Sequence, residues 1–143
     1  MISLALAQEL KGAGLVWKAS NHDFFAIPDR GMDDRLFVIT DIMAHLDLLQ
    51  GWPVITFHGT AEWALDYIVT TEVVWMPTEG QLRQELENLL KDEVEKVLQL
   101  WWQNGRYHTQ IQYQNETLTF DAATASDAYG KAILTILQTS YSS

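Results

Sequence analysis

The chain has 143 residues and contains no cysteine. This absence excludes disulfides, zinc–thiolate sites, iron–sulfur clusters and cysteine nucleophiles. A domain of about this length buries roughly 68–70% of the surface that its unfolded chain would expose, which is enough for a core without cross-links. We therefore expect one domain spanning residues 1–143.

Basic residues are scarce. Nine Lys and Arg stand against nineteen Asp and Glu, so the formal net charge is -10. Such a charge repels nucleic acid and anionic membranes, because attraction between Lys or Arg and phosphate dominates that kind of binding. We expect a protein partner, basic if charge selects it, and no nucleic acid. An acidic surface that only keeps the protein soluble is the other interpretation.

Long hydrophobic runs are also missing. No segment approaches the ~18 apolar residues that span a bilayer. The start, MISLALAQELKGAG, is interrupted by Gln8, Glu9 and Lys11 and lacks the basic flank of a signal peptide. We expect a cytoplasmic protein that does not insert into a membrane.

Catalytic motifs are absent from the sequence. It contains no G-x-S-x-G, no P-loop and no dinucleotide-binding G-x-G-x-x-G. The four histidines, His22, His45, His58 and His108, include no pair at the i, i+4 spacing that directs two imidazoles toward one zinc ion. We expect neither a metal nor a cofactor, and a non-enzymatic protein.

What is present is a regular succession of helix and strand signals. Thr78 and Gln81 have the spacing of a capping box, and Asn104-Gly105 is the strongest short signal for a β-hairpin. The sequence predicts an α+β fold with predominantly antiparallel sheets packed by about four helices. The expected helices are 3–11, 60–68, 78–90 and one beginning at 124–127, and the expected strands are 15–18, 23–27, 36–39, 41–50, 52–57, 73–75, 97–103, 106–113 and 118–120.

Two segments offer candidate binding residues. His58 precedes the expected helix start, where backbone amides could hold an anion, and Glu62 and Trp63 follow it. A capping or packing role for His58 is the simpler interpretation. In the PDRGMDD loop, Asp29 and Asp33 could bind a hard cation, but neighbouring arginines favour a solvated turn.

The third candidate is the Trp101-Trp102 pair. Adjacent residues of a strand point to opposite faces of a sheet, so one indole must leave the main core. Either a helix covers that face, or it binds a partner, a ligand or a second copy of the chain. We expect Trp101 to belong to a binding surface.

Five stretches carry a resemblance: LAQELKGAGLVW, FFAIPDRGMDDRLFVITD, FHGTAEWALD, WMPTEGQLRQEL and DAYGKAIL. Together they resemble a family of small, uncharacterised bacterial proteins often labelled pilus-assembly-related. The resemblance implies a cytoplasmic accessory protein, and no active site comes with it. Two alternatives stay open. One is an acidic immunity or antitoxin-like inhibitor of a basic partner. The other is a small hydrolase with His58, Glu62 and Asp29 in one cleft.

Overall fold

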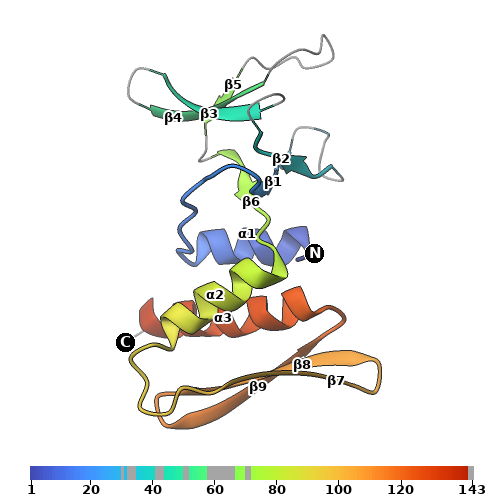
Figure 1. Cartoon of the computed structure of the whole chain (residues 1–143), viewed down its shortest axis with the longest axis vertical. Helices are drawn as coiled ribbons and strands as arrows, with labels where there is room; N and C mark the ends of the chain where they lie inside the picture. Colours follow the sequence, from blue (N-terminus) through green and yellow to red (C-terminus); the bar gives the residue numbers. More distant parts are fainter. Residues whose placement is uncertain are drawn as a thin grey trace. The chain divides into compact units, whose positions relative to one another are not determined.

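A computed structural model describes residues 1–29, 31, 35–40, 44–49, 52–57, 67–69 and 72–141 (Figure 1). The chain divides into two compact units. The helix–sheet unit comprises Met1–Leu15 and Pro77–Ser143, and the inserted unit is Val16–Met76. The single-domain expectation is not tested by this division and stays a prediction.

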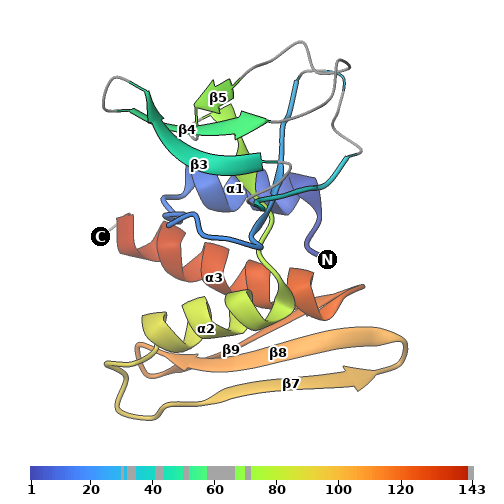
Figure 2. The ribbon, with the colours of Figure 1, turned by 45° about the horizontal axis from the view of Figure 1, so that its top comes forward.

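The helix–sheet unit contains three helices and one sheet in its described part. The helices are α1 (Leu4–Gly12), α2 (Glu79–Leu89) and α3 (Ala125–Tyr141). Strands β7 (Leu98–Gln103), β8 (Arg106–Tyr113) and β9 (Glu116–Ala122) form an antiparallel sheet with β8 in the middle. Helix α3 packs on β8 and β9, while α1 and α2 pack on α3. Figures 1 and 2 show all three helices on the same side of this sheet.

Local sequence signals explain these helices well. The Thr78 hydroxyl accepts a hydrogen bond from the Gln81 amide at 3.2 Å, and the Gln81 side chain accepts one from the Thr78 amide at 2.9 Å. This confirms the capping box, which satisfies two amides that the first helical turn leaves open. The apolar residues that follow at steps of four form the buried side of α2 and of its C-terminal cap, namely Leu82, Leu86 and the cap residue Leu90.

Two tight turns set the register of the sheet. Asn104 and Gly105 both have positive φ, 52° and 76°, as a type I′ turn requires, so the predicted hairpin is confirmed. The second turn lies at Gln114-Asn115, with φ of 52° and 65°, one residue before the expected position. Glu116 begins β9 instead of belonging to the turn.

The inserted unit contains two small antiparallel sheets in its described part. One has the order β2-β1-β6 and the other the order β3-β4-β5. The predicted hairpin of 41–50 with 52–57 is confirmed over β3 and β4. The strands are β1 (Phe24–Ala26), β2 (Phe37–Val38), β3 (Ala44–Leu49), β4 (Trp52–Phe57), β5 (Tyr67–Val69) and β6 (Val74–Trp75).

The predicted strand at 15–18 is wrong, because residues 15–20 belong to no strand. Strand β1 has β2 on one side and β6 on the other, so no edge is left for a third neighbour. Trp17 instead packs beside Phe25, with ring centroids 6.1 Å apart. It covers the buried cluster of Phe25, Ile27, Ile39 and Val73.

The number of helices differs from the expectation. Residues 60–66 of the predicted helix 60–68 lie outside the described part, but Tyr67–Val69 forms β5 and pairs with β4. The β-branched side chains of Ile68 and Val69 favour this strand over a helix end. The described residues therefore hold three helices rather than about four. The α+β class with antiparallel sheets is confirmed.

Candidate interaction surface

The register of the C-terminal sheet separates its side chains into two faces. Residues paired across antiparallel strands point to the same face, and alternate residues point to opposite faces. The face toward α3, here called the inner face, is mostly apolar and includes Ile111 and Ala122, both buried. The opposite face, here called the outer face, comprises Gln99, Trp101, Gln103, Arg106, His108, Gln110, Gln112, Thr117, Thr119 and Asp121.

Trp101 lies on the outer face, and Trp102 lies on the inner one. Trp101 stacks on His108, its direct partner on β8, with ring centroids 5.2 Å apart and planes 11° apart. Its indole Nε1 donates to the Gln103 side-chain oxygen at 3.2 Å. The indole is therefore held in place on a face that no described helix of this unit covers.

Beside this stack lies an ion pair. Arg106 Nε lies 2.6 Å from Asp121 Oδ2, and both side chains are about half exposed. The hydrogen bond and the charge of Arg106 lower the pKa of Asp121, and Lys131 and His108 add to the effect. Lys131 also donates to the backbone carbonyl of Asp121 at 2.6 Å. The charges at this end of the outer face are thus locally compensated.

Amide and hydroxyl side chains make up most of the remaining outer face. Gln112 donates to the Thr117 hydroxyl at 2.7 Å across the β8–β9 pair. Planar amides around an aromatic ring offer both donors and acceptors to a partner without the desolvation penalty of unpaired charges. Such a surface suits a polar, aromatic-anchored protein interface.

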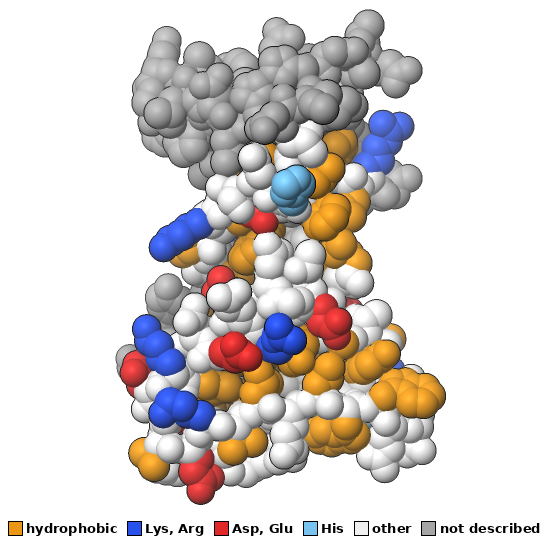
Figure 3. All heavy atoms as spheres, viewed as in Figure 1, with side chains coloured by type: hydrophobic (Ala, Val, Ile, Leu, Met, Phe, Trp, Pro, Cys, Tyr) orange, Lys and Arg blue, Asp and Glu red, His pale blue; other side chains and the backbone are white. Residues whose placement is uncertain are grey.

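Trp102 presents a different surface. It lies at the end of β7 on the inner face, yet 66% of it is exposed. Helix α3 packs on β8 and β9, and the apolar side chains of edge strand β7 are only partly covered. Figure 3 shows hydrophobic side chains gathered over α2 and the lower strands in this view. The sequence predicted that one of the two indoles leaves the core. In the structure neither Trp101 nor Trp102 belongs to the buried core, and Trp102 is the more exposed of the two.

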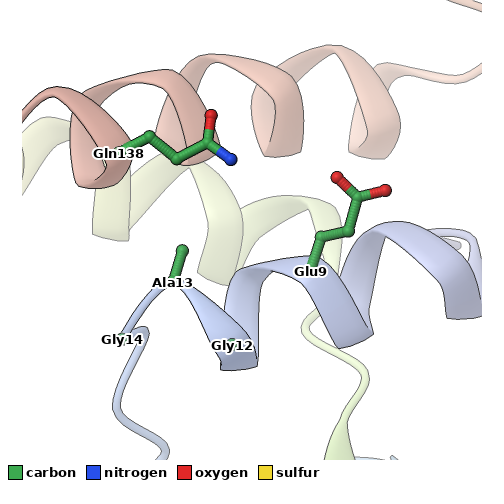
Figure 4. Close-up of a pocket in the computed structure, with 5 residues that line it drawn as sticks. All are labelled: Glu9, Gly12, Ala13, Gly14 and Gln138. Carbon is green, nitrogen blue, oxygen red and sulfur yellow. The ribbon is translucent and has the colours of Figure 1, made fainter.

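Two open depressions lie among the described residues of the helix–sheet unit. One, of about 540 Å³, is lined by Glu9, Gly12, Ala13 and Gly14 near the end of α1 and by Gln138 of α3. Figure 4 shows the Glu9 and Gln138 side chains extending into the same space. One carboxylate and one amide can bind a polar group there, but they include no nucleophile with an adjacent base.

The other depression, of about 410 Å³, lies where α2 and α3 begin. The Thr124 hydroxyl caps α3 by accepting from the Asp127 amide at 3.1 Å, while Thr78 caps α2. Asp127 in turn accepts from the Ser3 amide at 2.8 Å. Protein side chains thus already bond to the helix starts, where an anion would otherwise bind.

The other candidate residues from the sequence are only partly described. Asp29 has φ of 65°, a left-handed conformation that aspartate tolerates, and lies in the expected turn. His58, Glu62, Trp63 and Asp33 lie outside the described residues. Whether Asp29 shares a cleft with His58 and Glu62 stays a prediction. Across the described ranges, no group of three His, Asp or Glu side chains is placed to hold a metal ion.

Sequence reasoning did not single out Arg106, His108 or Asp121. Counting residues outward from both sides of the Asn104-Gly105 turn places His108 opposite Trp101, so the sequence could have predicted this pair. The sequence could not have predicted the position of Asp121 opposite His108, because the turn between β8 and β9 lies one residue from its expected position and this displacement changes every β8–β9 pair.

In comparisons with known proteins, no family model, no curated protein and no solved structure matches the chain. No helix among the residues described is both long and apolar enough to cross a bilayer.

Proposed function

We propose that this chain is a non-enzymatic interaction protein that binds a protein partner through the outer face of its C-terminal sheet. The observation that carries the proposal is Trp101, which is stacked on His108 on a sheet face away from the helices. Interface centres are enriched in tryptophan and arginine, and an aromatic ring held in one orientation loses little entropy on binding.

The position of Trp101 separates binding from folding. Helix α3 packs on the opposite face of the sheet, so truncating Trp101 removes little of the hydrophobic core. We expect Trp101→Ala to weaken partner binding at least about tenfold, since interface tryptophans are frequent hot spots. Its effect on thermal stability should stay small, as for other substitutions outside the core.

The experiment is affinity purification of the tagged chain from its native host at low salt, followed by binding measurements with the purified partner. The resemblance to pilus-assembly-related proteins makes cytoplasmic components of pilus or secretion machinery the first partners to seek. Val94→Ala is the matched control, because Val94 is 95% exposed and lies outside the outer face. Equal losses of binding and melting temperature in Trp101→Ala would contradict the proposal.

The net charge of -10 favours a second candidate, an inhibitor of a basic protein such as a nuclease-like toxin. Charge complementarity would make such a complex weaken steeply as salt is added, because ions screen the attraction. Binding through the mostly uncharged outer face should depend on salt only slightly. Measuring the affinity for the captured partner at low and high salt therefore separates the two candidates.

A further inference from the structure

The two edges of the C-terminal sheet are protected very differently. Edge strand β9 carries the charged residues Glu116 and Asp121, and Lys131 donates to the Asp121 carbonyl. Edge strand β7 has the sequence LQLWWQ, with no charge and no proline. Natural edge strands usually carry one of these protections, because an open row of backbone groups is a template for another strand.

The turn next to β7 determines which of its backbone groups are open. A two-residue type I′ turn makes its flanking residues, Gln103 and Arg106, a hydrogen-bonded pair. Hydrogen-bonded and non-bonded pairs alternate along antiparallel strands. The backbone N–H and C=O groups of the alternate residues, Leu98, Leu100 and Trp102, therefore point away from β8. Among the described residues, none of these three has a backbone hydrogen bond in a turn, loop or cap.

The same three residues carry the partly covered apolar side chains. Leu98 and Leu100 are half-buried on the inner face, and Trp102 is 66% exposed. One edge thus combines open backbone groups with apolar side chains that need cover. Another extended strand along β7 would form hydrogen bonds with these backbone groups and cover these apolar side chains.

We propose that a second copy of this chain pairs with it through antiparallel β7 strands, giving a continuous six-stranded sheet. A twofold axis at Leu100 places Leu100 opposite Leu100 of the second copy, and Leu98 opposite Trp102 of the second copy. Each β7 residue whose backbone groups point away from β8 then lies opposite a residue of the second copy whose backbone groups also point away from its own β8. Each such pair exchanges two N–H···O bonds. The pattern of β7 is self-complementary, as a twofold interface requires.

Electrostatic repulsion between two copies should be weakest at the β7 edge. Each copy has a formal charge of -10, so most of their surfaces repel each other. Strand β7 brings no charge to the contact. Added salt screens the remaining repulsion and should strengthen the dimer, whereas it would weaken binding to a basic partner.

The test is sedimentation velocity of the full chain over a range of concentrations, at about 50 and about 500 mM NaCl. We expect a reversible dimer that is tighter at the higher salt. Trp102→Lys introduces the charge by which natural edges are protected, and it should raise the dimer dissociation constant about tenfold or more. Thr119→Lys places the same charge at an exposed position on edge strand β9 and should leave the dimer dissociation constant unchanged.

A spin label measures the register directly. The chain has no cysteine, so Gln103→Cys provides a single labelling site on an exposed residue. With the axis at Leu100, the two Gln103 backbones are about 20 Å apart, at about 3.4 Å per residue. A monomer at all concentrations, a dimer unaffected by Trp102→Lys or equally weakened by Thr119→Lys, or a label distance far from this value would each overturn the proposal. This dimer needs no other partner, so the result is independent of the function proposed above.

Discussion

Arg106 reaches diagonally across the β8–β9 pair to Asp121, with 2.6 Å between Arg106 Nε and Asp121 Oδ2. Because His108 is the direct cross-strand partner of Asp121, the same carboxylate also lies beside the residue on which Trp101 stacks. The Arg106–Asp121 ion pair on the outer face therefore lies directly beside the stacked rings of Trp101 and His108.

Replacing Arg106 with Gln should raise the pKa of Asp121 toward its ordinary value, because the bond and charge that lower it are removed. Carboxyl chemical shifts followed through a pH titration measure this. The lowered pKa stabilises the folded state above the unfolded pKa of about 3.9, and that contribution is lost as pH falls through the folded pKa. As a control, Arg83→Gln removes the exposed ion pair with Glu87 and should leave the pKa of Asp121 unchanged. An unchanged Asp121 pKa in Arg106→Gln would be the contrary result.

The capping box of α2 should contribute measurably to stability. Thr78→Ala removes the hydroxyl that accepts from the Gln81 amide and should lower the free energy of unfolding by about 0.5–2 kcal/mol. Thr78→Ser keeps the acceptor and should cost less. Urea unfolding followed by far-ultraviolet circular dichroism measures both. Equal losses for Ala and Ser would show that the hydroxyl is not the cause.

Gly130 permits the close approach of α1 to α3. A Cβ atom there would lie 2.7 Å from Leu6 Cδ2 and 3.3 Å from Leu6 Cγ. We expect Gly130→Ala to destabilise, since overpacking costs about 1–3 kcal/mol against about 1 kcal/mol of helix propensity gained. Gly80→Ala in α2, where nothing lies within 4 Å, should stabilise instead. Thermal unfolding compares the two variants. If Leu6→Ala does not relieve the effect of Gly130→Ala, the proposed clash is wrong.

Asp23 should matter for the loop that precedes β1. Its buried carboxylate accepts from Trp17 Nε1 at 2.9 Å and from the Ser20 amide at 3.0 Å. Asp23→Ala leaves these donors without that acceptor and should cost about 1–3 kcal/mol. Asp23→Asn keeps one oxygen and should cost less. Denaturant unfolding gives the energies, and near-ultraviolet circular dichroism reports on the indole environment. A fully stable Asp23→Ala variant would contradict this role.

Thr109 is a site where a substitution should stabilise. It is fully buried on the inner face, and its hydroxyl has no hydrogen-bond partner among the described residues. Thr109→Val keeps the shape and removes the unsatisfied group, so stability should rise by about 1 kcal/mol. Thr119→Val on the exposed outer face is the control and should change little. A destabilised Thr109→Val variant would mean that the hydroxyl is satisfied by an internal water.

The sequence by itself determined the elements whose signals are local. The capping residues of α2, the Asn104-Gly105 turn and the apolar spacing of α3 each depend on residues a few positions apart, so they could be predicted. The pairing of Trp101 with His108 could be predicted in the same way, because the Asn104-Gly105 turn sets the register of β7 against β8.

Only the tertiary structure decided how distant segments pair. The last two residues of the helix expected over 60–68 belong to β5, because strand β4 offers a partner that no local pattern reveals. Strand β6 pairs with β1 across nearly fifty residues, and within the described ranges Leu15–Lys18 pair with no strand. Likewise, the ion pair at Asp121 depends on a turn position decided by the whole β8–β9 register. Local propensity is a weak preference, and long-range pairing that buries apolar surface outweighs it.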